Sequence, residues 1–280
     1  MWFFGRGPVV PVLRFSGPIG LVTPLRPGLS IALAAAAIEK AFEMSKLPTV
    51  AVVVNSPGGS PVQSSLIFRR IRQLAEEHGK TVYVFCEDVA ASGGYYLALA
   101  GDEIYADASS IVGSIGVIFS SFGFDKAIEK LGIERRVHTA GESKDALDPF
   151  RPERPEDVER LKNLQRDVHD VFIGIVKERR AGRLGGSDQE LFSGAFWSGP
   201  RALELGLIDG ITDIRSKMRE LHGDKVRLKV VPLERGGLLW RLKRLAAVKG
   251  YDELTSGRLA IAEDLISAVE TRALWSRFGL

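Results

Sequence analysis

The segment TVAVVVNSPGG, Thr49 to Gly59, is typical of a β-strand that is buried on both faces and ends in a sharp turn. Its apolar run lacks the polar alternation of a half-exposed strand, which favours a parallel sheet covered by helices. The next residues, Pro61 to Gly79, repeat apolar side chains at helical spacing between an initial proline and a final glycine. Together these segments predict a strand–turn–helix unit of an α/β fold.

Strand and helix patterns alternate outward from this unit. Further strands are predicted at Pro8–Gly17, Lys80–Glu87, Asp102–Asp107 and Ile133–Gly141. Further helices are predicted from Ile31 to Phe42 with Ser30 as cap, over Asp125–Leu131, and over the amphipathic stretch Pro155–Gly182. The alternation predicts a mostly parallel sheet with helices packed outside it.

The composition is that of an ordinary globular protein. The chain has 280 residues, of which 45% are hydrophobic and 26% charged, so disorder is excluded. Its net charge of +3 comes from 38 basic and 35 acidic residues without a basic stripe, which argues against a nucleic-acid partner. Cys86 is the only cysteine, which excludes internal disulfides and a cysteine-based metal cluster and fits a reducing compartment.

The apolar stretches are too short to cross a membrane. The opening MWFFGRGPVVPV has four apolar-rich residues before Gly5 and does not resemble a secretory signal. The runs Ile31–Ile38 and Ala108–Phe124 both fall short of the roughly 20 apolar residues that span a bilayer. We therefore expect a cytoplasmic protein without a signal peptide or a transmembrane helix.

A change in composition near residue 235 predicts a division into a main domain, 1–235, and an amphipathic helical tail, 236–280. The tail holds a basic segment around Trp240 and a second helical pattern from Leu259 to Leu280. Such helices can pack on the parent domain or on a sister subunit, or can contact the anionic inner leaflet of a membrane peripherally.

The segment VAASGGYYLALAG, Val89 to Gly101, contains a candidate nucleophile. Ser92 lies between small residues, just before a helix expected over Tyr95–Ala100. A serine hydroxyl needs a base and a group that stabilises the oxyanion, and the Gly93 amide can supply one donor at the start of that helix. A glycine of NSPGG can supply a second donor. Small residues at a strand-to-helix turn also fit tight packing alone, so this pattern by itself does not establish catalysis.

The sequence leaves the base open. His78 and His222 each precede a glycine at a helix end, and His169 lies in the long amphipathic helix, so we expect these three at the surface or as caps. His138 lies in a predicted strand, with no carboxylate clearly placed to orient its ring.

A lysine can replace histidine when burial leaves its amine neutral. Lys144 in AGESKDALDPF is the candidate, because it follows a predicted strand and precedes apolar residues. The adjacent Glu142 and Asp145 count against it, since carboxylates that face an amine raise its pKa.

Five motifs occur in a characteristic order: VNSPGG, ASGGYYLA, IVGSIGV, GESKDALDPF and WSGPRALELGLIDGI. In that order they resemble the signal peptide peptidase A family of serine peptidases, over about Pro8 to Gly210, in its short SohB-like form. The resemblance implies the ClpP–crotonase superfold: an α/β superhelix of repeated ββα units with a mostly parallel sheet, outer helices and, here, a C-terminal helical appendage.

The resemblance also implies roles for particular residues. Ser92 would be the nucleophile, Lys144 the general base, and Ser114 the residue that holds the lysine amine, with the oxyanion bound by the amides of Gly59 and Gly93. It implies hydrolysis of apolar peptides, such as signal-peptide remnants, through an acyl-enzyme and without a metal or cofactor. It further implies a homo-oligomeric ring or dome in which adjacent subunits can complete the dyad.

Two alternatives stay open at this point. A crotonase-type enzyme of the same superfold would bind an acyl-CoA thioester, and a non-catalytic oligomeric scaffold would act at the membrane. The chain departs from many family members in showing no membrane-spanning helix, and its lysine has acidic neighbours.

Overall fold

The computed structural model describes residues 7–20, 28–141, 143–233, 269 and 272–280. The described residues form a sheet with the order β6-β5-β3-β2-β1-β8, to which β4 is added beside β3 and β7 beside β4. Every pairing is parallel except that of β5 with β6. The strands are β1 (Val9–Ser16), β2 (Thr49–Ser56), β3 (Thr81–Ala91), β4 (Glu103–Ala106), β5 (Ile111–Gly113), β6 (Phe196–Ser198), β7 (Gly210–Ile211) and β8 (Arg227–Val231).

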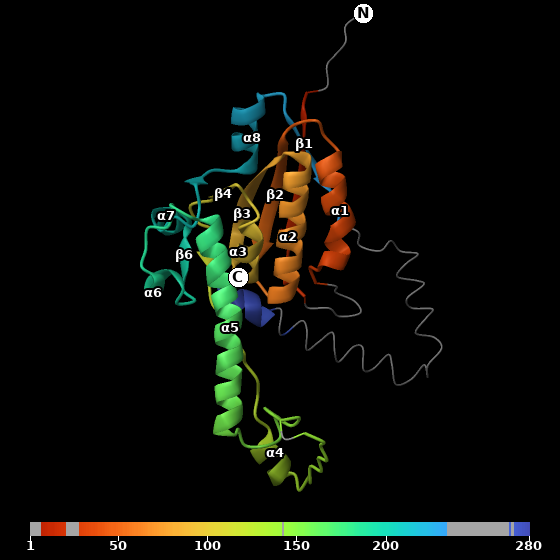
Figure 1. Cartoon of the computed structure of the whole chain (residues 1–280), viewed down its shortest axis with the longest axis vertical. Coiled ribbons are helices and arrows are strands. Elements are labelled where there is room, and N and C mark those ends of the chain that lie inside the picture. Colours follow the sequence, from red (N-terminus) through yellow and green to blue (C-terminus); the bar gives the residue numbers. More distant parts are fainter. Residues whose placement is uncertain (1–6, 21–27, 142, 234–268, 270–271) are drawn as a thin grey trace, which may run out of the picture.

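Helices cover both faces of the sheet, as the continuous apolar run of β2 predicts. One face packs against α1, α2, α3 and the C-terminal part of α5, and the other packs against α8 (Figure 1). The helices are α1 (Ile31–Glu43), α2 (Pro61–His78), α3 (Gly93–Ala98), α4 (Asp125–Lys130), α5 (Pro155–Arg179), α6 (Asp188–Leu191), α7 (Gly199–Glu204) and α8 (Ile214–His222).

Strand β3 is central and positions the site. Along one side it pairs with β2, and along the other its first half pairs with β4 and its last three residues, Val89–Ala91, pair with β5. Strands β2 and β3 run in parallel, so the loop after Ser56 and the turn after Ala91 emerge at the same edge of the sheet. Ligands of open parallel sheets bind at that edge, where the carboxyl ends of the strands lie.

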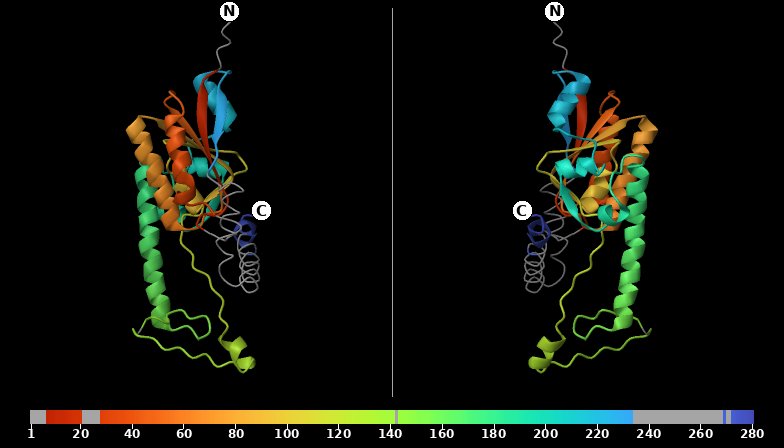
Figure 2. Two further views of the ribbon diagram at one scale, coloured as in Figure 1. Left: turned by 90° about the vertical axis from the view of Figure 1, so that its right-hand side faces the viewer. Right: turned by 90° about the vertical axis from the view of Figure 1, so that its left-hand side faces the viewer.

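A long arm leaves the sheet after β5. We call residues 118–141 and 143–164 the arm, and the other described residues the body. The chain runs outward to α4 and returns through α5, which meets the body only with its C-terminal part (Figures 1 and 2). The buried side chains of α5 on the body are Phe172 and Val176.

The structure corrects part of the predicted secondary structure. The strand predicted at Ile133–Gly141 is wrong: this stretch is exposed, lies in the arm and pairs with no described strand, and a strand needs such a partner for its backbone groups. The helix after Ser92 begins at Gly93 rather than Tyr95. Ser30 occupies the N-cap position of α1, but its side chain accepts no capping hydrogen bond. The other strands and helices predicted before residue 183 are confirmed, with small shifts at their ends.

Only the end of the predicted tail is described. The basic segment around Trp240 and most of Leu259–Leu280 lie outside the described residues, and residues 272–276 are helical. Phe278 packs against Val89 and Ala91 at the end of β3. Within the described ranges, none of the helices combines the length and the apolar character needed to cross a bilayer. The division at residue 235 stays a prediction.

Candidate active site

Ser92 joins the end of β3 to the start of α3 in a conformation that is rare for a residue with a side chain. Its φ is 53° and its ψ is −122°. Its amide donates to the Gly113 carbonyl (2.8 Å), and its carbonyl accepts from the Tyr96 amide (2.9 Å), so the turn is fixed from both sides. Such a backbone costs roughly 1–3 kcal/mol and persists where the surrounding structure imposes it, most commonly at functional sites.

The glycines around Ser92 allow two loops to approach closer than side chains would permit. A Cβ atom on Gly58 would lie 2.8 Å from the Ser92 Cβ atom, and one on Gly94 would lie 2.4 Å from the Ser56 carbonyl oxygen. The loop after β2 is therefore in direct contact with the serine turn. Tight packing and a half-buried serine that borders the groove are two consequences of the same arrangement.

Two backbone amides lie side by side next to Ser92. A Cβ atom built on Gly93 would lie 3.3 Å from the Gly59 nitrogen, and neither glycine amide donates to another described residue. Gly59 has a φ of 139°, and Ile19 holds its loop by accepting from the Ser60 amide (2.8 Å) and donating to the Gly58 carbonyl (2.9 Å). A pair of free amides beside a serine hydroxyl can bind the oxyanion of acyl transfer.

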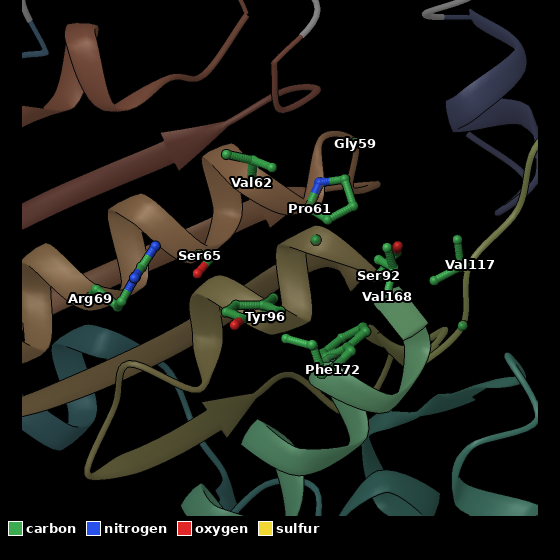
Figure 3. Close-up of a pocket in the computed structure, with 13 residues that line it drawn as sticks. Gly59, Pro61, Val62, Ser65, Arg69, Ser92, Tyr96, Val117, Val168 and Phe172 are labelled. Carbon is green, nitrogen blue, oxygen red and sulfur yellow. The ribbon is translucent and has the colours of Figure 1, made fainter. Parts of the chain in front are cut away.

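An apolar groove of about 240 Å³ begins at Ser92 and runs between α2, α3 and α5 (Figure 3). The ring of Tyr96 lies between Phe68 (5.6 Å between centroids) and Phe172 (5.1 Å), which fixes one wall of the groove. Valines supply much of the remaining apolar lining. The groove is lined by Gly59, Pro61, Val62, Ser65, Arg69, Ser92, Gly93, Tyr96, Gly116, Val117, Val168, Val171 and Phe172.

A second cavity of about 420 Å³ also reaches Ser92. Ser114 lines it and has a φ of 53°, and its amide donates to the Ala195 carbonyl (2.7 Å). The structure therefore brings four of the predicted site residues together: Ser92, Ser114, Gly59 and Gly93. The cavity is lined by Ser92, Ser114, Gly116, Val117, Ile118, His169, Ser193, Gly194 and Arg277.

The sequence analysis misplaced one histidine. His169, expected at the surface, is half-buried and lines the second cavity, with its Nε2 atom 3.0 Å from the Ile115 carbonyl oxygen. It lies three residues before Phe172, on the face of α5 that meets the body, and this spacing was the available signal. No Asp or Glu is among the residues that line the cavity, so a carboxylate that could orient this imidazole as a catalytic base is missing from the lining.

The other histidines lie away from Ser92. His78 ends α2 against the ring of Phe42, as expected of a residue at a helix end. His222 ends α8 and lies 3.0 Å from the Thr49 hydroxyl, and burial lowers its pKa. His138 is exposed in the arm.

Lys144 is not brought to Ser92 within one chain. It is exposed in a turn of the arm, next to Ser143, whose hydroxyl bonds Arg160 near the start of α5. On the same helix, Val168 is the groove residue nearest to Arg160, and the two residues lie about 12 Å apart along the helix axis. Any contact between this amine and Ser92 therefore requires another subunit or a large movement of the arm.

The acidic neighbour that counted against Lys144 is engaged elsewhere. Asp145 is paired with Arg151 and with Arg154 (3.0 Å), while Lys144 makes no ion pair with a described residue. Glu142 lies outside the described residues. The carboxylate of Asp145 is thus compensated by arginines.

A serine at a strained strand-to-helix turn, paired amides and an apolar groove form a site on an α/β sheet that is suited to acyl transfer. Residues 75–227, more than half of the chain, match the model of peptidase family S49. The chain belongs to this family, and its mostly parallel sheet flanked by helices agrees with the predicted ClpP-like superfold.

Two relatives carry protease names. The chain is 35% identical over 200 residues to a putative protease of Synechocystis, covering 69% of this chain and 70% of the relative. It is 30% identical over 188 residues to a putative signal peptide peptidase SppA of Enterococcus faecium, covering 67% of this chain and 54% of the relative.

A more similar relative carries a different name. The chain is 54% identical over 272 residues, 97% of its length, to a protein of Brucella abortus named Na(+)/H(+) antiporter NhaA. The matched part is 37% of that protein, so this chain spans little more than a third of it. The family model matches within the shared region.

Proposed function

We propose that the protein is a serine endopeptidase with a Ser92–Lys144 dyad, in which the lysine comes from a neighbouring subunit. The observation that carries this proposal is the separation of a built nucleophile site on the body from an exposed lysine on a projecting arm. The site that Ser92, the two amides and the groove form lacks only a general base. The protease names of the S49 relatives support peptide hydrolysis as the reaction.

The reaction follows from this arrangement. The neutral amine of Lys144 of the partner subunit accepts the proton of the Ser92 hydroxyl as the Oγ atom attacks the scissile carbonyl. The amides of Gly59 and Gly93 stabilise the oxyanion. The protonated lysine then gives its proton to the leaving amine as the C–N bond breaks. In the second step the neutral lysine takes a proton from water, which attacks the acyl-enzyme, and returns that proton to the Ser92 Oγ atom as the ester bond breaks.

The second cavity is the expected receiving site for the lysine. Ser92 and Ser114 both line it, so an amine that enters there meets the nucleophile and a second hydroxyl. Enclosure in the cavity lowers a lysine pKa by desolvation, which keeps the amine neutral and able to act as a base.

The arm provides the surface for assembly. It exposes Phe119, Phe122 and Leu131, the last two to 79% and 73%, around the segment that carries Lys144. Large apolar side chains exposed together on a projecting segment indicate contact with another protein surface. A second copy of the chain is the partner that would also receive the lysine.

The substrates we propose are apolar peptides. The groove at Ser92 is lined mainly by valine, proline and aromatic side chains, so it suits an apolar side chain next to the scissile bond. Remnants of signal peptides have this character.

The proposal is tested by assaying Ser92→Ala and Lys144→Ala on an internally quenched leucine-rich peptide. Each variant should lose activity by a factor of about 10² or more, with an unchanged far-UV spectrum and assembly state. Lys130→Ala, which removes another exposed lysine of the arm, is the control and should stay active. Full activity of either site variant would refute the dyad, and acyl-CoA turnover indifferent to Lys144 would favour a crotonase-type enzyme.

A further inference from the structure

The second cavity carries positive charge and is lined by no carboxylate. Of its nine lining residues, Arg277 and His169 are the two that can be cationic, and none is Asp or Glu. The Arg277 side chain is exposed to solvent and lines the cavity. A guanidinium next to neutral polar groups, such as Ser114 and Ser193, is suited to bind a carboxylate by paired hydrogen bonds.

Arg277 is fixed in place by its neighbour in the chain. Phe278 is 8% exposed and packs against Val89 and Ala91, which immediately precede the serine turn. Its ring lies 5.1 Å from that of Phe196, edge to face, and Phe196 follows closely on the cavity residues Ser193 and Gly194. The C-terminal segment 272–280 is thereby anchored beside the nucleophile, and Arg277 is a residue of the site wall.

The two cavities meet at Ser92 and differ in chemistry. Ser92, Gly116 and Val117 line both. The groove is otherwise mainly apolar apart from Ser65 and Arg69 on α2, while the second cavity is mainly polar and contains His169 and Arg277. A peptide attacked at Ser92 extends to both sides of its scissile bond. If the apolar acyl portion occupies the groove, the departing portion faces Arg277.

We propose that the second cavity binds a carboxylate of the substrate's leaving portion, with Arg277 as the specificity-determining residue. This inference rests on the proposed function, since it takes Ser92 as the attacking group. The enzyme would then prefer peptides that carry a carboxylate a short distance after the scissile bond. The carboxylate is either the C-terminal α-carboxylate or an acidic side chain.

The test measures binding without catalysis. An N-terminally fluorescein-labelled heptapeptide of leucine and alanine is titrated by anisotropy with the Ser92→Ala protein in three forms: free acid, C-terminal amide, and amide with glutamate as last residue. The free acid should bind about tenfold more tightly than the plain amide. The glutamate amide distinguishes the two sources of carboxylate.

Further variants on the Ser92→Ala background assign the preference to Arg277. Arg277→Ala should abolish it and Arg277→Lys should keep part of it, while Arg272→Ala, on the same segment, should leave it unchanged. An acid-to-amide ratio that is equal with and without Arg277, or equally reduced by Arg272→Ala, would overturn the inference. The Arg277→Lys variant also shows whether the preference for the free acid is lost in Arg277→Ala because the positive charge is removed or because the segment 272–280 no longer packs on the body.

A hydrolysis assay with protein that retains Ser92 distinguishes a failure of this inference from a failure of the proposed function. Peptide fragments are identified by mass spectrometry over a range of pH. If nothing is cleaved but the binding preference persists, the peptidase proposal fails and the carboxylate site stands. A different result would overturn the carboxylate site. The free-acid and amide peptides would be cleaved at equal rates, and Arg277→Ala would shift the pH profile of cleavage equally for both, which would mean that Arg277 affects the general base instead.

Discussion

The body and the arm differ in how they bury apolar side chains: every buried apolar residue of the described chain lies in the body, and none lies in the arm. In the body, even a charged residue is enclosed and compensated: Arg180 is 1% exposed, forms two bonds to Asp209 (2.8 and 3.0 Å) and a third to the Gly206 carbonyl (2.8 Å). In the arm, apolar Phe122 is 79% exposed. The body therefore buries its apolar side chains within the described chain, while the arm exposes apolar side chains that no described residue covers. The predicted nucleophile and base fall on opposite sides of this division.

The largest effect on stability is expected from Arg180→Ala. The substitution leaves Asp209 as a carboxylate without its main partner and leaves a buried carbonyl with one donor fewer. Removing one member of a buried pair costs about 3–5 kcal/mol. Urea denaturation followed by circular dichroism should show this fall in the free energy of unfolding.

Arg201→Ala is the control for that measurement. Arg201 also pairs with two carboxylates, those of Glu190 and Glu204, but its side chain is about half exposed. Its loss should cost less than about 1 kcal/mol. If both variants lost the same free energy of unfolding, the buried polar contacts of Arg180 would stabilise the body no more than exposed ion pairs do.

A smaller effect, on assembly alone, is expected from Phe122→Asp. The side chain makes little contact within its own chain, so the unfolding free energy should stay within about 0.5 kcal/mol. If a partner covers the ring, each subunit contact should weaken by about 1.5–3 kcal/mol. Sedimentation velocity over a range of concentrations should show dissociation, with loss of peptidase activity.

Leu203→Asp offers a comparison on the body. Leu203 is 40% exposed on α7, and its replacement should leave the sedimentation profile unchanged. If both variants assemble like the unmodified protein, the arm is not the assembly surface.

The smallest effect is expected from Gly174→Ala on α5, close to where the helix meets the body. Gly174 is exposed, and a Cβ atom there would contact nothing within 4 Å. Alanine should therefore stabilise the helix by about 0.5–1 kcal/mol because it loses less backbone entropy on folding. A thermal melt should shift upward slightly. A lower melting temperature would mean that this face of α5 has a partner in the native assembly.

The sequence predicted the body well because apolar runs and turn residues act locally there. The buried strand Thr49–Ser56, the helix from Pro61 and the serine turn follow from such patterns. The prediction of a strand at Ile133–Gly141 failed because the segment has few apolar residues and no strand among the described residues lies beside it.

The residues missed at the site have a common physical cause. His169 and Arg277 reach the second cavity only through the packing of α5 and of the C-terminal segment on the body. Neither contact is encoded by local spacing alone, although the position of His169 relative to Phe172 was a usable signal. The exposed position of Lys144 likewise depends on how the arm projects, which no local pattern reveals.

Mixing two inactive variants tests the division of the active site most directly. Ser92→Ala and Lys144→Ala subunits are co-expressed with different affinity tags, and mixed assemblies are isolated and assayed on the leucine-rich peptide. A dyad formed between subunits predicts that activity returns to between about a quarter (large ring) and about a half (dimer) of the unmodified level, because these are the fractions of sites in mixed assemblies that pair an intact serine with an intact neighbouring lysine. Mixed assemblies that stay as inactive as either parent would contradict it.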